Sequence, residues 1–282
     1  FFDYVFLGKG KAEDVDISRE QLEDIRASFA YWYPNDHRHT FSAHLSNHLS
    51  FMLFAHTAVF AKKFWPKKFS FHGMVLSEGG KMSKSKGNTV TLLEMKKEYG
   101  ADTFRAFLCS STSVQSSMDW RGSEAKKMQQ HLENLYQILL SMKKHIAENK
   151  HSRKFSDAAV ISRIERFTKK ASDCLDIMDL RGYSTVVLYE FLHIYTSVNR
   201  KGEELSAFFS YLLPRWVMLL SPLVPHYAEE VWESLGHKDY VSLAAWPSYD
   251  AKKIDEKAES LVEMDEQILV DVQVIKKLAK IE

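Results

Sequence analysis

The stretch GGKMSKSKGN, Gly79–Asn88, places three lysines among small and flexible residues. A run of alternating apolar residues precedes it, and a capped helix is predicted directly after it. Mobile ammonium groups in such a loop can close over a triphosphate and neutralise the charge that develops on the leaving pyrophosphate. The glycines let the backbone bend and approach a ligand closely. A solvated basic surface loop is the alternative that any single KxxK would suggest.

The residues before this loop have the pattern of an α/β domain. Short β-like stretches are predicted at Asp3–Leu7 and at the alternating Phe69, Phe71, Gly73 and Val75. Helical patterns lie between and around the β-like stretches.

Capping residues locate the helices on both sides of the loop. Ser18 begins a capping box, and a second helix is predicted over Leu45–Lys62. Thr91 with Glu94 repeats the capping box, and Gly100 stands where a left-handed C-cap is expected. A short helix is therefore predicted directly after the lysine loop.

From Ser123 onward the apolar residues alternate steps of four and three, which is the spacing of a helix packed in a bundle. The first stripe consists of Met128, Leu132, Leu135, Leu139, Met142 and Ile146, and the second of Ile161, Ile164, Phe167, Ala171, Cys174 and Met178. Further helices are predicted over Tyr183–Val198, over Ala207–Leu220 and from Pro225. A strand-like piece, Tyr240–Trp246, then precedes a charged amphipathic segment, Ala251–Glu282.

Composition excludes some classes of protein and leaves others open. The 38 basic and 37 acidic residues balance to a formal charge of +1, so any nucleic-acid contact must be local. Cys109 and Cys174 lie far apart without a CxxC spacing, and both are predicted to be buried thiols. The longest apolar run, Phe208–Tyr227, is interrupted by an arginine and three prolines, so no membrane segment is predicted.

The lysine loop resembles the KMSKS signature of class I aminoacyl-tRNA synthetases, whose two lysines help to stabilise the transition state of amino-acid adenylation by ATP. The resemblance implies that Lys81 and Lys84 are catalytic and that Met82, Ser83 and Ser85 contact the nucleotide. A five-residue match followed by GN is far more specific than a lone glycine pattern.

Other segments are similar to leucyl-tRNA synthetases of the archaeal/eukaryotic type, namely DYVFLGKG, YWYPNDHR, YGADTFR, MDWRG, SPLVPHYAEEVWESLG and VSLAAWP. The implied fold is an α/β domain followed by an all-α bundle. Residues 1–122 would form part of a Rossmann catalytic domain with the KMSKS loop and the stem-contact region. Residues 123–250 would form an anticodon-binding helical bundle, and residues 251–282 a linker or C-terminal helix.

The chain departs from the family where the ATP-binding wall is expected. The family usually carries SGKDL there, whereas this chain has Phe41 in the glycine position and Ala43 in the aspartate position. A bulky ring obstructs close approach by a nucleotide, and alanine cannot accept a hydrogen bond from the ribose. Asn47 and His48 do match positions near the family's nucleotide site.

The histidines His44, His48 and His56 are near helical spacing, so three interpretations stay open for them. They are ordinary surface or buried histidines, remnants of a nucleotide site, or a metal pair without an evident third ligand.

The HIGH signature, which the family needs for catalysis, does not occur in residues 1–282. One hypothesis is that the chain is part of a leucine-tRNA ligase of the cytoplasm that uses ATP with Mg²⁺ and binds tRNA(Leu) or another tRNA. The chain would be either a fragment of that enzyme or one subunit of a split enzyme with a separate HIGH-bearing subunit. Alone, it is predicted to be inactive. The alternative is a non-catalytic paralogue that binds tRNA or a protein partner, and a third hypothesis is a structural remnant that stabilises a partner.

Three clusters of basic residues could contact phosphate, although such clusters are more often solvated helix faces. The clusters are Lys62, Lys63, Lys67 and Lys68; Lys143, Lys144, Arg153 and Lys154; and Lys169 and Lys170.

Overall fold

The computed structural model describes residues 1–83, 85, 87, 89, 91–149, 154–198 and 202–279. The chain forms two compact units. The first unit contains Phe1–Met74 and Gln115–Ser117, and the second contains Val75–Val114 and Met118–Glu282. The domain boundaries expected near residues 122 and 250 stay predictions.

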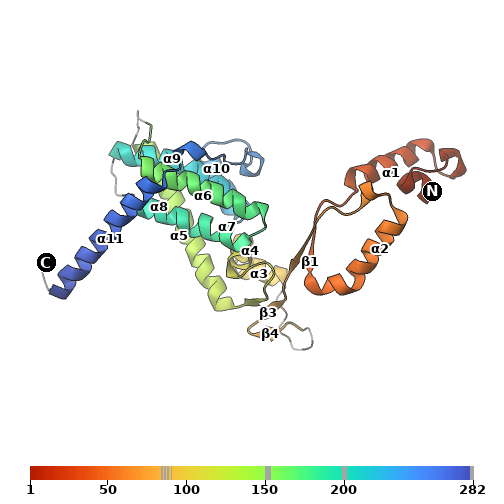
Figure 1. Cartoon of the computed structure of the whole chain (residues 1–282), viewed down its shortest axis with the longest axis horizontal. Helices are drawn as coiled ribbons and strands as arrows, with labels where there is room; N and C mark the ends of the chain where they lie inside the picture. Colours follow the sequence, from red (N-terminus) through yellow and green to blue (C-terminus); the bar gives the residue numbers. More distant parts are fainter. Residues whose placement is uncertain are drawn as a thin grey trace. The chain divides into compact units, whose positions relative to one another are not determined.

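The first unit contains a parallel strand pair joined by a helix (Figure 1). Strand β1, Arg38–Phe41, pairs with β2, Phe69–His72, from Arg38 opposite Phe69 to Phe41 opposite His72. Helix α2, Ser50–Val59, lies in the connection. Parallel strands need such a crossover because a tight turn cannot join them.

Helix α1, Arg19–Trp32, begins as its sequence predicts, because the Ser18 side chain accepts a hydrogen bond from the Gln21 N–H. The predicted strand Asp3–Leu7 is wrong, since these residues form a π-helical turn. Val5 on this turn is buried with Leu22 of α1 in a small core. A short apolar run can supply either a strand or one helical turn, and here packing against α1 decides in favour of the helix.

The helix predicted over Leu45–Lys62 is interrupted and ends early. The backbone kinks at Asn47, whose φ of −122° and ψ of −114° are not helical, and α2 ends at Val59. A separate 3₁₀ turn covers Lys62–Phe64. The apolar alternation detected the helix, but it carried no signal for the kink.

The second unit begins with a small three-stranded sheet. Strand β3, Val75–Ser77, lies between β4, Gly80–Lys81, which is antiparallel to it, and β5, Met118–Trp120, which is parallel. The alternating run that ends at Val75 is therefore divided between two sheets. At the division, a Cβ on Gly73 would lie 2.2 Å from the Ser116 carbonyl oxygen, so only glycine fits there.

Helices α3, Leu92–Glu98, and α4, Ala101–Ser111, follow the lysine loop. The capping box of Thr91 and Glu94 is confirmed. Gly100 has the expected positive φ of 83°, but its ψ of 159° is extended, so it precedes α4 rather than forming a left-handed cap.

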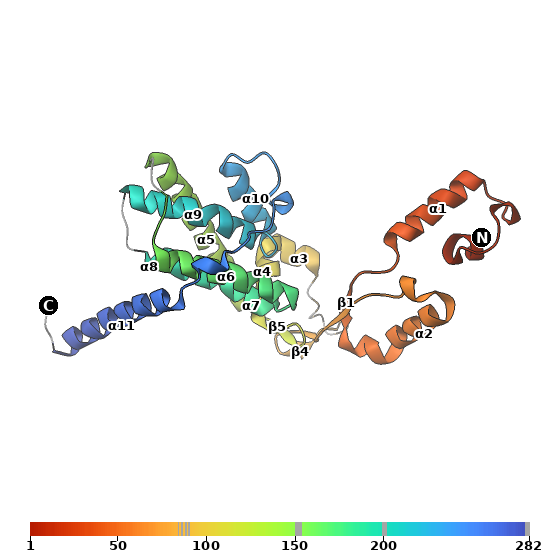
Figure 2. The same ribbon diagram turned by 45° about the horizontal axis from the view of Figure 1, so that its top comes forward.

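The rest of the unit is a helical bundle (Figure 2). Its helices are α5, Gly122–Glu148; α6, Ala158–Asp176; α7, Leu180–Thr185; α8, Phe191–Ser197; α9, Gly202–Leu220; and α10, Pro225–Ser234. A π-helical turn, Val186–Glu190, joins α7 to α8. Pro225 occupies the first turn of α10, where a missing N–H costs nothing.

Most residues of the two predicted apolar stripes are buried in one continuous core, which confirms the bundle. Leu132 and Leu139 on α5 are each 1% exposed, and Ile164 on α6 is fully buried. Trp216 of α9 is also fully buried, and its indole N–H donates to the Val187 carbonyl at 2.7 Å. Cys174 is buried as predicted, whereas Cys109 is only partly buried.

The strand predicted over Tyr240–Trp246 is wrong, because Val241–Leu243 form a 3₁₀ turn. The N–H groups of Val241 and Ser242 donate to the Glu229 carboxylate instead of to a neighbouring strand. The predicted C-terminal helix is confirmed as α11, Glu256–Ala279. Among the described residues, no helix has the length and apolar character needed to cross a membrane.

Candidate functional site

The lysine loop leaves the sheet through the β3–β4 hairpin. Its turn consists of Glu78 and Gly79, which have φ values of 49° and 78°. Positive φ is natural for glycine but unfavourable for glutamate, so the conformation of Glu78 must be held by its contacts. Two contacts are present: the Glu78 N–H donates to the Trp120 carbonyl at 3.0 Å, and the Glu78 carboxylate accepts from the Gly122 N–H at 3.2 Å.

Asp119 on the neighbouring strand β5 also fixes this turn. Its Oδ1 accepts from the Gly79 N–H at 2.8 Å, and its Oδ2 accepts from the Arg121 guanidinium at 2.8 Å. These two hydrogen bonds lower the pKa of Asp119, and the bond from Gly79 contributes more than the bond from Arg121. An ionised carboxylate therefore ties the start of the lysine loop to β5.

Trp120 connects this sheet to the helices behind it. Its ring lies 5.5 Å from that of Tyr99, 5.5 Å from Phe104 and 5.0 Å from Phe107, measured between centroids. Such aromatic contacts add stability beyond the area they bury. The MDWRG segment thus has a structural explanation, since its aspartate fixes the hairpin and its tryptophan fixes the sheet.

The expected KMSKS residues follow directly on the hairpin. Lys81 is exposed at the end of β4, and Met82 and Ser83 are half-buried. The Ser83 and Ser85 hydroxyls lie 2.8 Å apart. Lys84 lies outside the described residues, as do Lys86 and Asn88, so the structure tests neither their position nor their role.

Asn47 and His48 belong to the first unit. Both are exposed, and His48 Nε2 lies 2.8 Å from the Arg38 guanidinium. The Asn47 side chain accepts from the His48 N–H at 2.6 Å, which stabilises the kink before α2. Their proposed nucleotide contact stays a prediction.

Phe41 and its neighbours fill the end of β1. The Phe41 ring lies 5.8 Å from that of His72 and 5.9 Å from that of His44. His44 Nδ1 is 2.8 Å from the Thr40 hydroxyl. The strand end therefore presents aromatic rings at the position where the family resemblance led us to expect a glycine.

A metal pair of His44 and His48 has no structural support. Their rings are 4.9 Å apart in an edge-to-face contact, and each is within hydrogen-bonding distance of a residue on β1. Among the described side chains, no group of three or more histidine, cysteine, aspartate and glutamate residues is arranged to hold a metal.

Several lysines of the three basic clusters are paired with carboxylates. Lys67 lies 2.6 Å from Asp36 and Lys144 lies 3.8 Å from Glu148, measured between charged atoms. Lys169 forms an ion pair with Asp173. These pairs are exposed and weak, but they reduce the local positive field that would attract phosphate. Arg153 lies outside the described residues.

Sequence reasoning did not single out the contact between Asp102 and His226. Asp102 on α4 is 4% exposed, and it accepts from the Tyr227 N–H at 2.8 Å and contacts His226 Nδ1 at 2.8 Å. The carboxylate therefore caps the N-terminus of α10. An aspartate that caps a distant helix leaves no local pattern in the sequence, because its partners here are more than a hundred residues away.

Two family models match the chain. Residues 20–121 match the tRNA synthetases of class I (I, L, M and V), and residues 157–282 match the anticodon-binding domain of tRNA ligases. The first match contains the hairpin and the lysine loop, and the second begins at the N-cap of α6.

The curated relatives include two leucine-tRNA ligases of similar identity. That of Staphylothermus marinus is 36% identical over 96% of this chain, and that of Archaeoglobus fulgidus is 35% identical over 98%. The matched region is 29% of the length of each relative.

Solved structures support the fold. The leucyl-tRNA synthetase agnB2 of Agrobacterium radiobacter, in a ternary complex with tRNA and LeuAMS, matches 82% of this chain and 33% of its own, with a TM-score of 0.68 and 18% identity. A methionyl-tRNA synthetase of Mycobacterium tuberculosis matches 73% of this chain and 45% of its own, with a TM-score of 0.57 and 18% identity. The chain is thus a homologue of leucine-tRNA ligases over nearly its whole length, with a class I tRNA-synthetase segment followed by a tRNA-ligase anticodon-binding domain.

Proposed function

We propose that this chain supplies the KMSKS loop and the tRNA-binding bundle of a leucine-tRNA ligase. In that role, Lys81 and Lys84 would neutralise charge on the triphosphate of ATP while leucyl-adenylate forms. The observation that carries the proposal is the hairpin before the loop, in which the Asp119 carboxylate holds the Gly79 N–H at 2.8 Å. This bond fixes the point at which the lysine loop leaves the sheet, which a merely solvated loop does not need.

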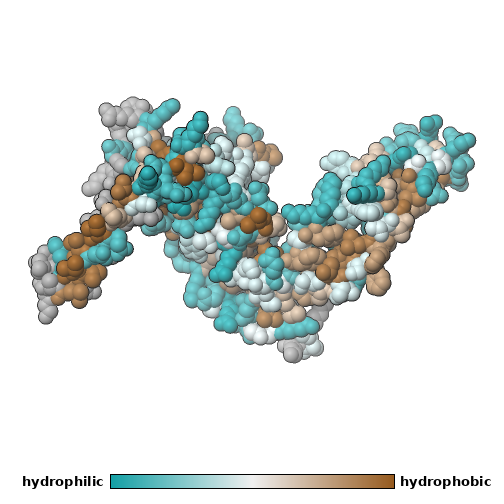
Figure 3. All heavy atoms as spheres, in the orientation of Figure 1, coloured by the Kyte–Doolittle hydropathy of each residue, from teal (hydrophilic) through white to brown (hydrophobic). Residues whose placement is uncertain are grey.

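The remainder of the active site must come from a HIGH-bearing part of the enzyme. Parallel sheets are normally covered on both faces and contain more than two strands, whereas the first unit holds only β1 and β2. Helix α2 also exposes large apolar side chains, with Phe51 75% and Phe54 74% exposed. Figure 3 shows the resulting apolar surface over this helix.

We infer that the HIGH-bearing half covers this apolar face of α2 and extends the β1–β2 sheet. The HIGH-bearing half of such a domain supplies parallel strands and apolar helices. The strands could pair with the β1–β2 sheet, and the helices could pack against the apolar face of α2. ATP with Mg²⁺, leucine and the tRNA acceptor end would then be bound by the two halves together.

A second candidate function is supported by Phe41. Its ring packs between His72 and His44, and Ala43, two residues further along the chain, is exposed and offers no side-chain acceptor. These residues favour a synthetase-like chain that binds tRNA or a protein without forming the adenylate. Catalysis by the completed assembly distinguishes the two candidates.

Salt-dependent binding of tRNA is predicted if the chain is part of a ligase, and also if it is a non-catalytic chain that binds tRNA. In a filter-binding titration with bulk tRNA, the affinity of the isolated chain should fall about tenfold or more between roughly 50 and 200 mM salt, because bound lysines and arginines release counterions. The absence of any binding at the lowest salt would contradict a tRNA-binding role.

A further inference from the structure

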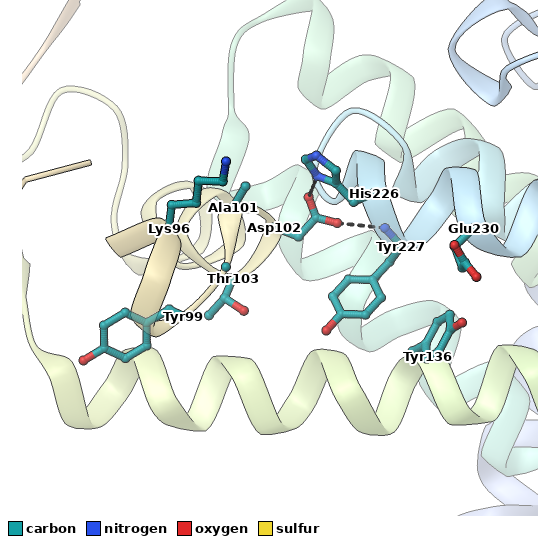
Figure 4. Close-up of a pocket in the computed structure, with 10 residues that line it drawn as sticks. Lys96, Tyr99, Ala101, Asp102, Thr103, Tyr136, His226, Tyr227 and Glu230 are labelled. Carbon is teal, nitrogen blue, oxygen red and sulfur yellow. Dashed lines mark hydrogen bonds and ion pairs between the residues drawn. The ribbon is translucent and has the colours of Figure 1, made fainter. Parts of the chain in front are cut away.

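A pocket in the second unit lies apart from the lysine loop, at the meeting point of α3, α4, α5 and α10 (Figure 4). Its volume of about 480 Å³ falls in the range of small-ligand sites. Three tyrosines, Tyr99, Tyr136 and Tyr227, provide most of its aromatic wall. The Tyr136 and Tyr227 rings are 5.3 Å apart and tilted by 47°, so they do not form a closed stack.

The wall contains one threonine hydroxyl. Thr103 is only 2% exposed and lines the pocket. Figure 4 shows its oxygen turned to the side of Tyr227. A hydroxyl in the wall of a pocket can donate a hydrogen bond to a polar group of a ligand or accept one from it.

Asp102 positions one residue at the pocket mouth but is not itself free to bind a ligand. One of its oxygens caps α10 through the Tyr227 N–H, and the other holds His226 Nδ1. The His226 side chain is 77% exposed, so its second ring nitrogen is left to face solvent or a ligand. The rim therefore offers an oriented imidazole.

The charges at the rim have opposite signs. Lys96 and His226 lie on one side, and the exposed carboxylate of Glu230 lies on another (Figure 4). An ammonium and an imidazole suit a phosphate, whereas a carboxylate suits amino and imino hydrogens at the edge of a base. Aromatic walls suit the face of the base.

We propose that this pocket binds an unstacked guanine nucleotide of a bound RNA. The base would lie against the Tyr136 and Tyr227 rings, and Glu230 would accept hydrogen bonds from guanine N1–H and N2–H. The Thr103 hydroxyl would bond to a polar edge of the base, while Lys96 and His226 would contact its phosphate. The assignment to RNA rests on the proposed tRNA-binding function, whereas the ligand chemistry rests on the pocket itself.

The direct test measures binding of GMP, IMP and UMP to the full chain by titration calorimetry or by NMR shifts. GMP should bind about tenfold more tightly than IMP, which lacks the 2-amino group, and UMP should bind more weakly than GMP. Glu230→Gln should remove the preference for GMP over IMP, and Thr103→Val should lower GMP affinity about fivefold. Glu233→Gln, on the same helix outside the pocket, serves as the control and should bind as the wild type.

A measurement on the wild type avoids dependence on the folding of variants. Irradiation of the chain with 8-azido-GMP should label peptides that contain Tyr136 or Tyr227, and excess GMP should prevent the labelling. Equal affinity for the three nucleotides, or labelling elsewhere only, would overturn the proposal.

A third titration separates this proposal from the proposed function. If bulk tRNA binds and both Thr103→Val and Glu230→Gln bind it as the wild type does, the pocket assignment fails while the tRNA-binding function stands. If GMP binds with the expected preference but tRNA does not bind, the pocket stands and the tRNA-binding function fails.

Discussion

At the scale of single residues, Asp119 carries the connection between the sheet and the lysine loop. We expect Asp119→Ala to free the Gly79 N–H and to speed hydrogen exchange in the β3–β4 hairpin by about tenfold, because a bond to a charged acceptor contributes roughly 1.5 kcal/mol. Exchange mass spectrometry measures the change. Arg121→Ala is the matched control, since it removes the other partner of Asp119 and leaves the bond from Gly79; equal exchange in the wild type and in Asp119→Ala would exclude the anchoring role.

The ionisation of Glu165 is expected to make the free energy of unfolding depend on pH. Burial acts to raise its pKa, but hydrogen bonds from Arg215, Tyr211 and the Asp250 N–H outweigh burial, so the pKa lies below its usual value of 4.5. The native state therefore gains stability from the ionised carboxylate above about pH 4.5, and this gain is lost as the pH falls through the lower folded pKa.

Urea unfolding of Glu165→Gln tests this account. At neutral pH the substitution should cost about 3 kcal/mol, since it leaves Arg215 without its buried partner, which is 1% exposed. The difference from the wild type should shrink below pH 4.5. Glu148→Gln, which loses only an exposed ion pair with Lys144, should change the free energy of unfolding by less than about 0.5 kcal/mol. A difference that is constant down to acid pH would contradict the assigned protonation.

Local signals at single residues are read well from the sequence, and distant partners are not. Ser18 and Thr91 cap their helices as expected because both caps involve residues three positions apart. His226, which contacts Asp102, lies 124 positions from it, and Gly79, which donates to Asp119, lies 40 positions from it, so no local spacing predicts either contact. The chemistry of the loop stays a prediction from its residues, whereas the contacts that fix the hairpin before it required the fold.

At the scale of elements, long periodic segments were predictable and short ones were not. Helix α5 repeats its apolar stripe from Met128 to Ile146, and this repeated signal leaves no other structure open. Asp3–Leu7 and Tyr240–Trp246 are each a single short apolar piece. Their structure is decided by tertiary partners, namely α1 for the first and the Glu229 carboxylate for the second.

The exposed face of α2 provides a prediction at the same scale. Replacing Phe51 and Phe54 with aspartate should not destabilise the isolated chain, because both side chains are about three-quarters exposed. The double variant should instead lose binding to the HIGH-bearing half of a homologous leucine-tRNA ligase, measured by calorimetry. As the control, Lys62→Asp with Lys63→Asp changes charge on the turn after α2 and keeps the apolar face. Unchanged binding by the phenylalanine variant would exclude α2 as the contact.

At the scale of the whole molecule, homology and local geometry support different parts of the account. The chain is 36% and 35% identical to two leucine-tRNA ligases, and the matched region is 29% of their length. The hairpin and its carboxylate anchor support a working KMSKS loop, while Phe41 and Ala43 support loss of nucleotide binding. Adding the HIGH-bearing half of a homologous enzyme distinguishes the two interpretations, because the first predicts catalysis by the mixture and the second predicts none.

The most direct measurement is leucine-dependent exchange of pyrophosphate into ATP. The isolated chain should show no exchange, because residues 1–282 contain no HIGH signature. The chain mixed with the HIGH-bearing half of a homologous leucine-tRNA ligase should show exchange, and Lys81→Ala should reduce it at least about a hundredfold through loss of transition-state stabilisation. Exchange by the isolated chain, or none by the assembled halves, would contradict the claim that this chain supplies the KMSKS part of a ligase.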